Sequence, residues 1–203
     1  MSPIAPTSDQ VPVLYVIVVY AVVIFAAWVV PGARVVITPL KLFTIGWHEL
    51  CHISMAVLTG GSVLKVSIDP DAGGATIVSG GHPPTILAAG YVGSTIFGGL
   101  FIMAGFDTLV SKIMSFVLGI GLVAPLALAL TGDIADDKYF HKANDSDATQ
   151  WAIMFPKTRA HVWAIIWIVF EIAVLIGFVF LGIAAFKRTP DEMYAEAAQF
   201  LPT

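Results

Sequence analysis

The strongest constraint on the fold of this chain is a series of apolar runs, each about 20 residues long, the length that a helix needs to cross a bilayer. Of its 203 residues, 58% are hydrophobic and only 12% are charged, and the mean hydropathy is +0.88. Soluble domains carry about 25% charged residues, so the composition indicates a membrane protein. The sequence therefore predicts an all-α, multi-pass integral membrane protein, a bundle of about five transmembrane helices at 11–30, 39–59, 84–106, 108–130 and 161–186.

The segment between the second and third predicted spans is too polar to cross the membrane and predicts a small β-hairpin. Residues 63–68 and 75–78 are short β-prone runs, and apolar and polar residues alternate in the first of them. Asp69 and Asp71 lie between the runs, where we expect them to form the turn. An open strand edge can pair with an extended peptide, so the hairpin is a candidate substrate-binding element. Its candidate residues are Leu64, Val66, Ile68, Ala75 and Ile77.

The rest of the chain indicates one integral-membrane domain over residues 1–203, with a polar loop at 131–159 and a tail at 187–203. The formal net charge of -4 is spread out with no basic patch, which argues against nucleic acid as a partner. The first apolar run lacks a basic segment before it and is interpreted as a retained span, not a cleaved signal peptide. Lys and Arg divide equally between the two sides of the membrane, so the orientation stays open.

The second predicted span contains the motif H-E-x-x-H, formed by His48, Glu49 and His52. Residues four apart share one face of a helix, so the two imidazoles can bind one zinc ion at about 2.0–2.1 Å. Glu49 lies beside that face, where a carboxylate can act as general base toward water on the metal. Ionisable residues are costly inside a bilayer, which favours a functional interpretation. Cys51 is interpreted as a packing residue.

A catalytic zinc takes a third protein ligand, and the residues alone leave its identity open. At about 1.5 Å per residue, the two histidines lie roughly 13 Å below the hairpin side of the membrane. Glu171 in the fifth span reaches a similar depth of roughly 15 Å, and an intramembrane Glu is a functional candidate. Asp133, just past the fourth span, approaches the same side of the membrane. In the third span, Gly90, Ser94 and Gly98 predict close helix packing.

Taken together, these residues resemble the site-2 protease family of intramembrane zinc metallopeptidases, and within it a eukaryotic branch of small peptidase-like membrane proteins. The resemblance covers a core at residues 38–148. It rests on His48-Glu49-Leu50-Cys51-His52, Leu58-Thr59-Gly60-Gly61, Ile68-Asp69-Pro70-Asp71-Ala72-Gly73-Gly74-Ala75-Thr76, Ala89-Gly90-Tyr91-Val92-Gly93-Ser94, Asp133-Ile134-Ala135-Asp136-Asp137 and Asn144-Asp145-Ser146-Asp147-Ala148.

The resemblance implies roles for particular residues. His48 and His52 correspond to zinc ligands, Glu49 to the catalytic base, and Asp133 to the Asp that completes the site, with Asp136 and Asp137 as alternatives. Glu171 stays an alternative on the depth estimate alone. Better-known members place that Asp in a Leu-Asp-Gly or Pro-Asp-Gly setting, whereas here Ile134 follows it.

The function expected on this basis is an intramembrane zinc metalloendopeptidase that cleaves membrane-protein substrates in or near their transmembrane segments. Its expected cofactor is Zn2+, its partners are the lipid bilayer and a membrane-protein substrate, and its expected location is the endomembrane system. The alternative is a catalytically inactive protease-like scaffold or a metal-binding membrane protein.

Overall fold

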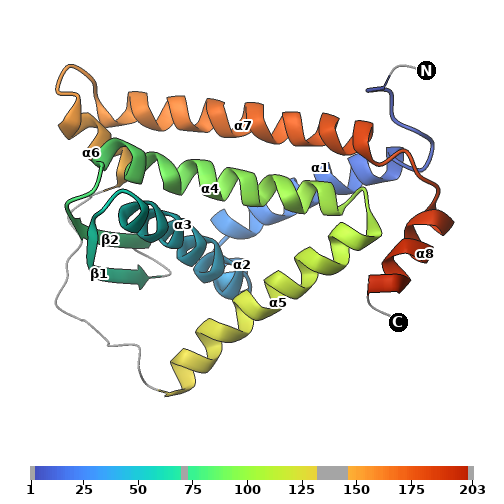
Figure 1. Cartoon of the computed structure of the whole chain (residues 1–203), viewed down its shortest axis with the longest axis horizontal. Helices are drawn as coiled ribbons and strands as arrows, with labels where there is room; N and C mark the ends of the chain where they lie inside the picture. Colours follow the sequence, from blue (N-terminus) through green and yellow to red (C-terminus); the bar gives the residue numbers. More distant parts are fainter. Residues whose placement is uncertain (1–2, 70–72, 132–145, 201–203) are drawn as a thin grey trace. The chain divides into compact units, whose positions relative to one another are not determined.

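Most of the chain folds into helices in the computed structural model, which describes residues 3–69, 73–131 and 146–200 (Figure 1). The elements are α1 (Val11–Val29), α2 (Ala33–Val36), α3 (Thr38–Leu58), β1 (Ser62–Asp69), β2 (Gly73–Ser79), α4 (Pro83–Ala104), α5 (Thr108–Thr131), α6 (Asp147–Met154), α7 (Ala160–Ala185) and α8 (Pro190–Phe200). The predicted fold class is confirmed, because the chain is mostly helical with a two-stranded antiparallel hairpin after the second long helix.

Among the residues that the structure describes, three helices are long and apolar enough to cross a membrane: α1, α4 and α7, with mean hydropathies of 2.5, 1.8 and 2.8. None of the residues of α1 is buried within the protein. Apolar surface of this extent is typical of helices that face lipid, where the helix satisfies its own backbone hydrogen bonds. Helices α3 and α5 occupy the positions of the second and fourth predicted spans.

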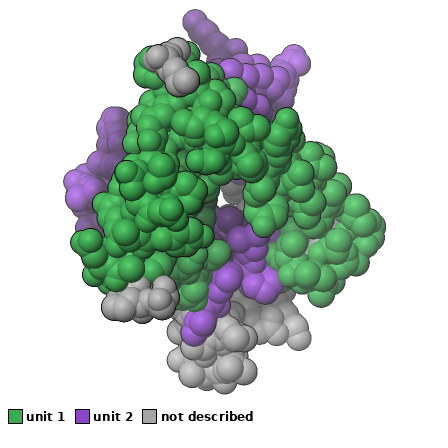
Figure 2. Space-filling view, turned by 90° about the vertical axis from the view of Figure 1, so that its right-hand side faces the viewer, with its two compact units in different colours: residues 1–38, 96–121, 173–203 green, residues 39–95, 122–172 purple. Residues whose placement is uncertain are grey.

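The folded chain divides into two compact units, which Figure 2 distinguishes by colour. Unit 1 comprises residues 1–38, 96–121 and 173–203, and unit 2 comprises residues 39–95 and 122–172. The H-E-x-x-H motif and the hairpin both belong to unit 2.

In unit 1, polar side chains connect the ends of helices. Gln10, which is 5% exposed, donates from Nε2 to the carbonyl oxygens of Ile183 at 3.2 Å and Phe186 at 2.7 Å. The start of α1 is thereby tied to the end of α7, where the last carbonyls have no partner within the helix. Arg188 forms ion pairs with Asp107 and with Glu196 of α8.

Replacement of Gln10 by Ala is expected to destabilise the protein, because two carbonyl oxygens at the end of α7 lose their donor. A buried carbonyl oxygen that is left without a donor costs about 1–3 kcal/mol. Thermal unfolding in detergent should therefore show a lower midpoint for Gln10→Ala than for the wild type. Asp9→Ala, which changes the exposed neighbour, is the control and is expected to leave the midpoint unchanged. Equal midpoints for the two variants would contradict this role of Gln10.

In unit 2, the sequence ends α3 sharply and turns the chain into the hairpin. Gly60 adopts a φ of +81°, which L side chains rarely adopt, and Gly61 donates its N–H to the Ala56 carbonyl oxygen at 2.8 Å. Both features are typical of a glycine-terminated helix.

The hairpin pairs β1 with β2 in an antiparallel register that places Val66 opposite Thr76 and Ile68 opposite Gly74. Residues directly opposite each other lie on the same face of the sheet. A β-bulge occurs between Val63 and Lys65, so Leu64 has no partner and the simple alternation predicted for this strand is interrupted. Four apolar hairpin side chains are exposed: Leu64, Val66, Ile68 and Ile77.

Candidate metal centre

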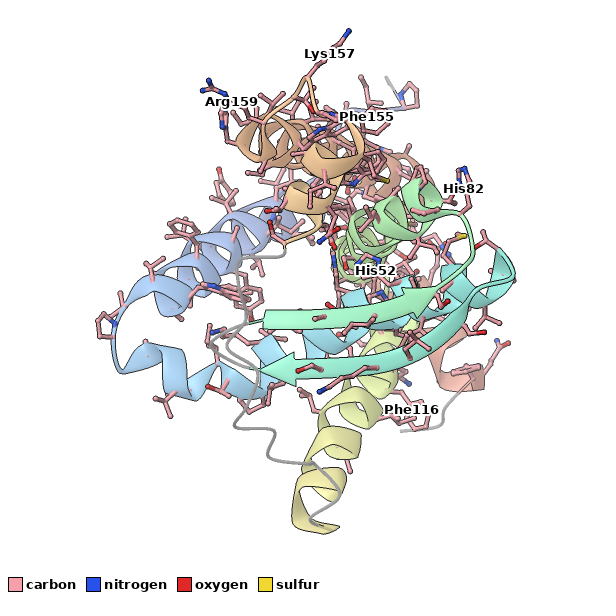
Figure 3. The ribbon with its side chains drawn as sticks, turned by 90° about the vertical axis from the view of Figure 1, so that its left-hand side faces the viewer. His52, His82, Phe116, Phe155, Lys157 and Arg159 are labelled. Atoms are coloured by element: carbon pink, nitrogen blue, oxygen red, sulfur yellow. The ribbon has the colours of Figure 1, made fainter. Side chains whose placement is uncertain are left out.

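Helix α3 brings His48, Glu49 and His52 together in unit 2. One possible ligand atom from each of the three lies within 4.8 Å of the others. Glu49 and His52 are buried, at 5% and 4% exposure, and His52 is labelled in Figure 3 next to the hairpin and α4. The helical spacing of the motif therefore produces the cluster that the sequence predicts.

Asp147, the first residue of α6, provides a carboxylate that contacts both histidines. Its Oδ2 lies 2.8 Å from His48 Nε2 and 3.2 Å from His52 Nε2. Ser146 caps α6, and its hydroxyl accepts a hydrogen bond from the Thr149 amide. The two Nε2 atoms thus converge on a single carboxylate oxygen at the beginning of a capped helix.

Helix α4 contacts the Nδ1 atoms of both imidazole rings and so orients the rings. His52 Nδ1 lies 2.7 Å from the Ile86 carbonyl oxygen, and His48 Nδ1 lies 3.3 Å from Ser94 Oγ. A carbonyl oxygen only accepts, so His52 must donate from Nδ1. The neutral ring then carries its lone pair on Nε2, which is the tautomer that binds a metal.

This arrangement fits a bound cation. The Nε2 lone pair of His52 faces an oxygen of Asp147, and two lone pairs at 3.2 Å repel each other unless a proton or a cation lies between them. Ligand atoms on a tetrahedral zinc with bonds of about 2.0–2.1 Å lie about 3.3 Å apart. The separation from His52 agrees with this value, and the 2.8 Å separation from His48 is slightly shorter.

The electrostatics of Asp147 agree with a metal-binding carboxylate. Burial opposes its ionisation, but when protons rather than a metal lie on the two Nε2 atoms, the hydrogen bonds and charges of His48 and His52 outweigh burial and hold the pKa of Asp147 below its usual range. The carboxylate is therefore ionised at neutral pH and contributes negative charge to the site.

The hairpin fixes Glu49. Thr76 donates its hydroxyl proton to Glu49 Oε2 at 2.6 Å. A Cβ on Gly74, two residues earlier on β2, would lie 2.0 Å from Glu49 Oε1, so only glycine lets the strand approach this closely. Cys51 packs against Gly93 of α4, which agrees with its interpretation as a packing residue.

Gly90 lets α4 approach the histidines. A Cβ at this position would lie 2.4 Å from His48 Nε2 and 2.5 Å from His52 Cε1. The Gly90 and Ser94 positions of the small-residue stripe therefore face the centre. The close packing predicted for the stripe is confirmed here, and its purpose at these two positions is to bring α4 against the imidazoles.

Gly90→Ala is expected to destabilise the protein, because the new methyl group overlaps both imidazoles, which their contacts with the Ile86 carbonyl and the Ser94 hydroxyl hold in place. Overpacking of this kind costs about 1–3 kcal/mol. Gly98→Ala, on the same helix, is the matched control, since its Cβ meets Leu175 Cδ2 at an ordinary 3.6 Å. Thermal unfolding in detergent should show a lowered midpoint for Gly90→Ala alone. If both variants unfold at the wild-type temperature, α4 does not approach the histidines this closely.

The third-ligand predictions have different outcomes. Asp133, Asp136 and Asp137 lie outside the described residues and stay predictions. Glu171 lies in unit 2 and hydrogen-bonds Thr95, and it is not part of the described cluster around His48. Sequence reasoning did not consider Asp147 as a ligand, although the resemblance includes the block 144–148. The available signal was the Ser146-Asp147 pair, an N-cap followed by an acidic first-turn residue.

The fold and the site define a helical membrane protein with an H-E-x-x-H helix whose two histidines face a carboxylate. Residues 17–131, more than half of the chain, match the family model described as Peptidase M50B-like. The chain therefore belongs to this family of membrane metallopeptidases of the site-2 protease type, which confirms the resemblance found in the sequence. Comparisons with curated proteins and with solved structures gave no match.

Proposed function

We propose that the protein is an intramembrane zinc metalloendopeptidase that hydrolyses peptide bonds in or near transmembrane segments of membrane-protein substrates. The observation that carries this proposal is the convergence of His48 Nε2 and His52 Nε2 on Asp147 Oδ2, beside the buried carboxylate of Glu49. Membership of a peptidase family and three helices able to span a membrane support it.

The proposed zinc ligands are His48, His52 and Asp147, a set of two nitrogens and one oxygen that is common at catalytic zinc. A zinc ion held there supplies Lewis acidity that polarises a carbonyl and makes water a nucleophile at neutral pH. Ile86 and Ser94 orient the two imidazoles, so the ligand geometry is prepared before metal binds.

Glu49 is the proposed general base. Thr76 holds Oε2 and fixes the orientation of the carboxylate. The carboxylate accepts a proton from the attacking water and then delivers it to the nitrogen of the departing amine.

The hairpin is the proposed element that binds substrate. A substrate helix must unwind before cleavage, because its backbone carbonyls are engaged in hydrogen bonds. Strand β2 lies against Glu49, and an unwound segment that pairs with a strand edge would be held extended near the base. Leu64, Val66, Ile68 and Ile77 are exposed on the hairpin, and Ala75 is half-buried, so the exposed side chains can contact apolar substrate residues.

Zinc content tests the ligand assignment. Purified protein in detergent is expected to contain a single zinc ion per chain, and His48→Ala and Asp147→Asn are expected to lose it, because each removes a ligand. Glu171→Gln, which changes a carboxyl of α7 to an amide, is the matched control and should retain zinc. Elemental analysis of the four proteins gives the ratio of metal to protein.

The other outcomes are equally informative. Zinc could be retained by Asp147→Asn and lost from Asp133→Asn, Asp136→Asn or Asp137→Asn. The third ligand would then lie in residues 133–137 instead. Loss in Glu171→Gln alone would move it into α7. A wild type that does not bind added zinc at all would contradict the metallopeptidase proposal.

Activity is tested by Glu49→Gln, which removes the proposed base and keeps the size and one oxygen of the side chain. We expect it to retain zinc and to lose turnover by at least about 100-fold, the lower end of what general-base catalysis contributes. The measurement is a proteome-wide determination of new protein termini in membranes from cells that express the wild type or the variant. New termini inside apolar segments should appear with the wild type only.

Equal sets of termini from the two proteins, with zinc bound to both, would contradict the enzymatic proposal. The alternative, a protease-like membrane scaffold that retains a metal site, would then be the better account.

A further inference from the structure

The carboxylate that completes the proposed centre comes from a short helix. Helix α6 has only 8 residues, and Asp147 is its first. Helices of this length are not stable by themselves in water, and most of their stability comes from packing. The position of Asp147 opposite the histidines therefore depends on what α6 packs against.

Trp151 is the residue of α6 best placed to provide this packing. It follows Asp147 by one helical turn, so the two side chains lie on the same face of α6. Trp151 is 8% exposed, and its ring stacks on Trp163 of α7, with ring centroids 4.6 Å apart and planes 25° apart. Trp167, one turn further along α7, lies 6.0 Å away at 49°.

These aromatic rings connect α6 with the candidate metal centre. Trp167 stacks on Tyr91 of α4 at 4.6 Å with planes 9° apart, and Tyr91 meets His48 edge-on at 5.5 Å. Helix α6 thus contacts α7 through Trp151, α7 contacts α4, and α4 contacts a candidate ligand. The ring contacts are therefore continuous from α6, the helix that begins at Asp147, to His48.

The indole N–H of Trp151 takes no part in this packing. Its Nε1 is buried without a hydrogen-bond partner among the described residues. Aromatic pairs are worth about 0.5–1.5 kcal/mol beyond the area that they bury. What Trp151 contributes is therefore the ring face, and phenylalanine can supply much of the same contact without an unpaired donor.

We propose that Trp151 is a positioning residue that holds Asp147 at the metal centre by stacking on Trp163 and packing against Trp167 of α7. This inference rests on the proposed function, because it assumes that Asp147 is a zinc ligand. Phe155, labelled in Figure 3, extends the same stack at the end of α6, 5.8 Å from Trp151 and 5.4 Å from Trp163.

The test is the zinc dissociation constant of the full chain in detergent, measured by competition with a chelator. Trp151→Ala is expected to weaken zinc binding by about 10–100-fold, the range found when residues that orient metal ligands are changed. Trp151→Phe is expected to restore affinity to within about threefold of the wild type, because the stacking face remains. Trp28→Ala, a tryptophan deletion in α1 of unit 1, is the control and should bind as the wild type does.

A double-mutant cycle distinguishes positioning from general destabilisation. If Trp151 acts through Asp147, then Trp151→Ala costs no further affinity for added zinc in a protein that already carries Asp147→Asn and holds the ion by the two histidines alone. A full additional loss in the double variant, or wild-type affinity of Trp151→Ala, would overturn the proposal.

Hydrogen exchange of α6 in the metal-free protein tests the same inference without zinc. Exchange at the α6 amides should be faster in Trp151→Ala than in the wild type and in Trp151→Phe, while exchange in α1 stays unchanged. Unchanged exchange in α6 would overturn the positioning role. A wild type that does not bind zinc, with α6 exchange faster in Trp151→Ala, would instead refute the proposed function and leave the packing role of Trp151 in place.

Discussion

The contact of His48 and His52 with one oxygen of Asp147 is the interaction on which the organisation of unit 2 depends. A buried polar group in an apolar environment is costly unless it is fully paired, and here three ionisable side chains, those of His48, His52 and Asp147, lie in contact. Each therefore needs a partner from another element. Helix α4 supplies the Ile86 carbonyl and the Ser94 hydroxyl, the hairpin supplies Thr76, and α6 supplies Asp147.

This concentration of partners explains the small residues around the centre. Side chains of ordinary size would keep neighbouring elements too far from α3 for hydrogen bonds of about 3 Å. Gly90 lets α4 approach the imidazoles, and Gly74 lets β2 approach Glu49. In lipid, helices gain little from the hydrophobic effect and associate by close packing, so small residues at a contact serve both assembly and the site. The stripe at Gly90 and Ser94 combines the two purposes.

The parts that could be predicted from the sequence are those that neighbouring residues determine. Helices follow from long apolar runs, the His48 and His52 pair follows from four-residue spacing, and the hairpin follows from alternating strands around a turn. The bulge at Leu64 and the contact with Asp147 depend on pairing between segments and leave no periodic pattern. The depth estimate that favoured Glu171 counted only residues within spans, whereas Asp147 begins a short helix outside the predicted spans. A carboxylate brought in by α6 could not be found by that estimate.

Under the proposed function, the hairpin meets two requirements at once. A buried base needs a hydrogen-bond donor to fix its carboxylate, and a helical substrate needs an extended partner before its backbone is open to attack. A helix can supply a side-chain donor, but its backbone N–H and carbonyl groups are already paired, so it cannot hold an extended substrate. A strand has a hydrogen-bonding edge and places alternate side chains on one face, so β2 can direct Thr76 toward Glu49 and still present backbone groups. The same geometry explains why glycine at position 74, one strand period before Thr76, is as necessary as the hydroxyl: without it, the strand could not lie close enough for Thr76 to reach the base.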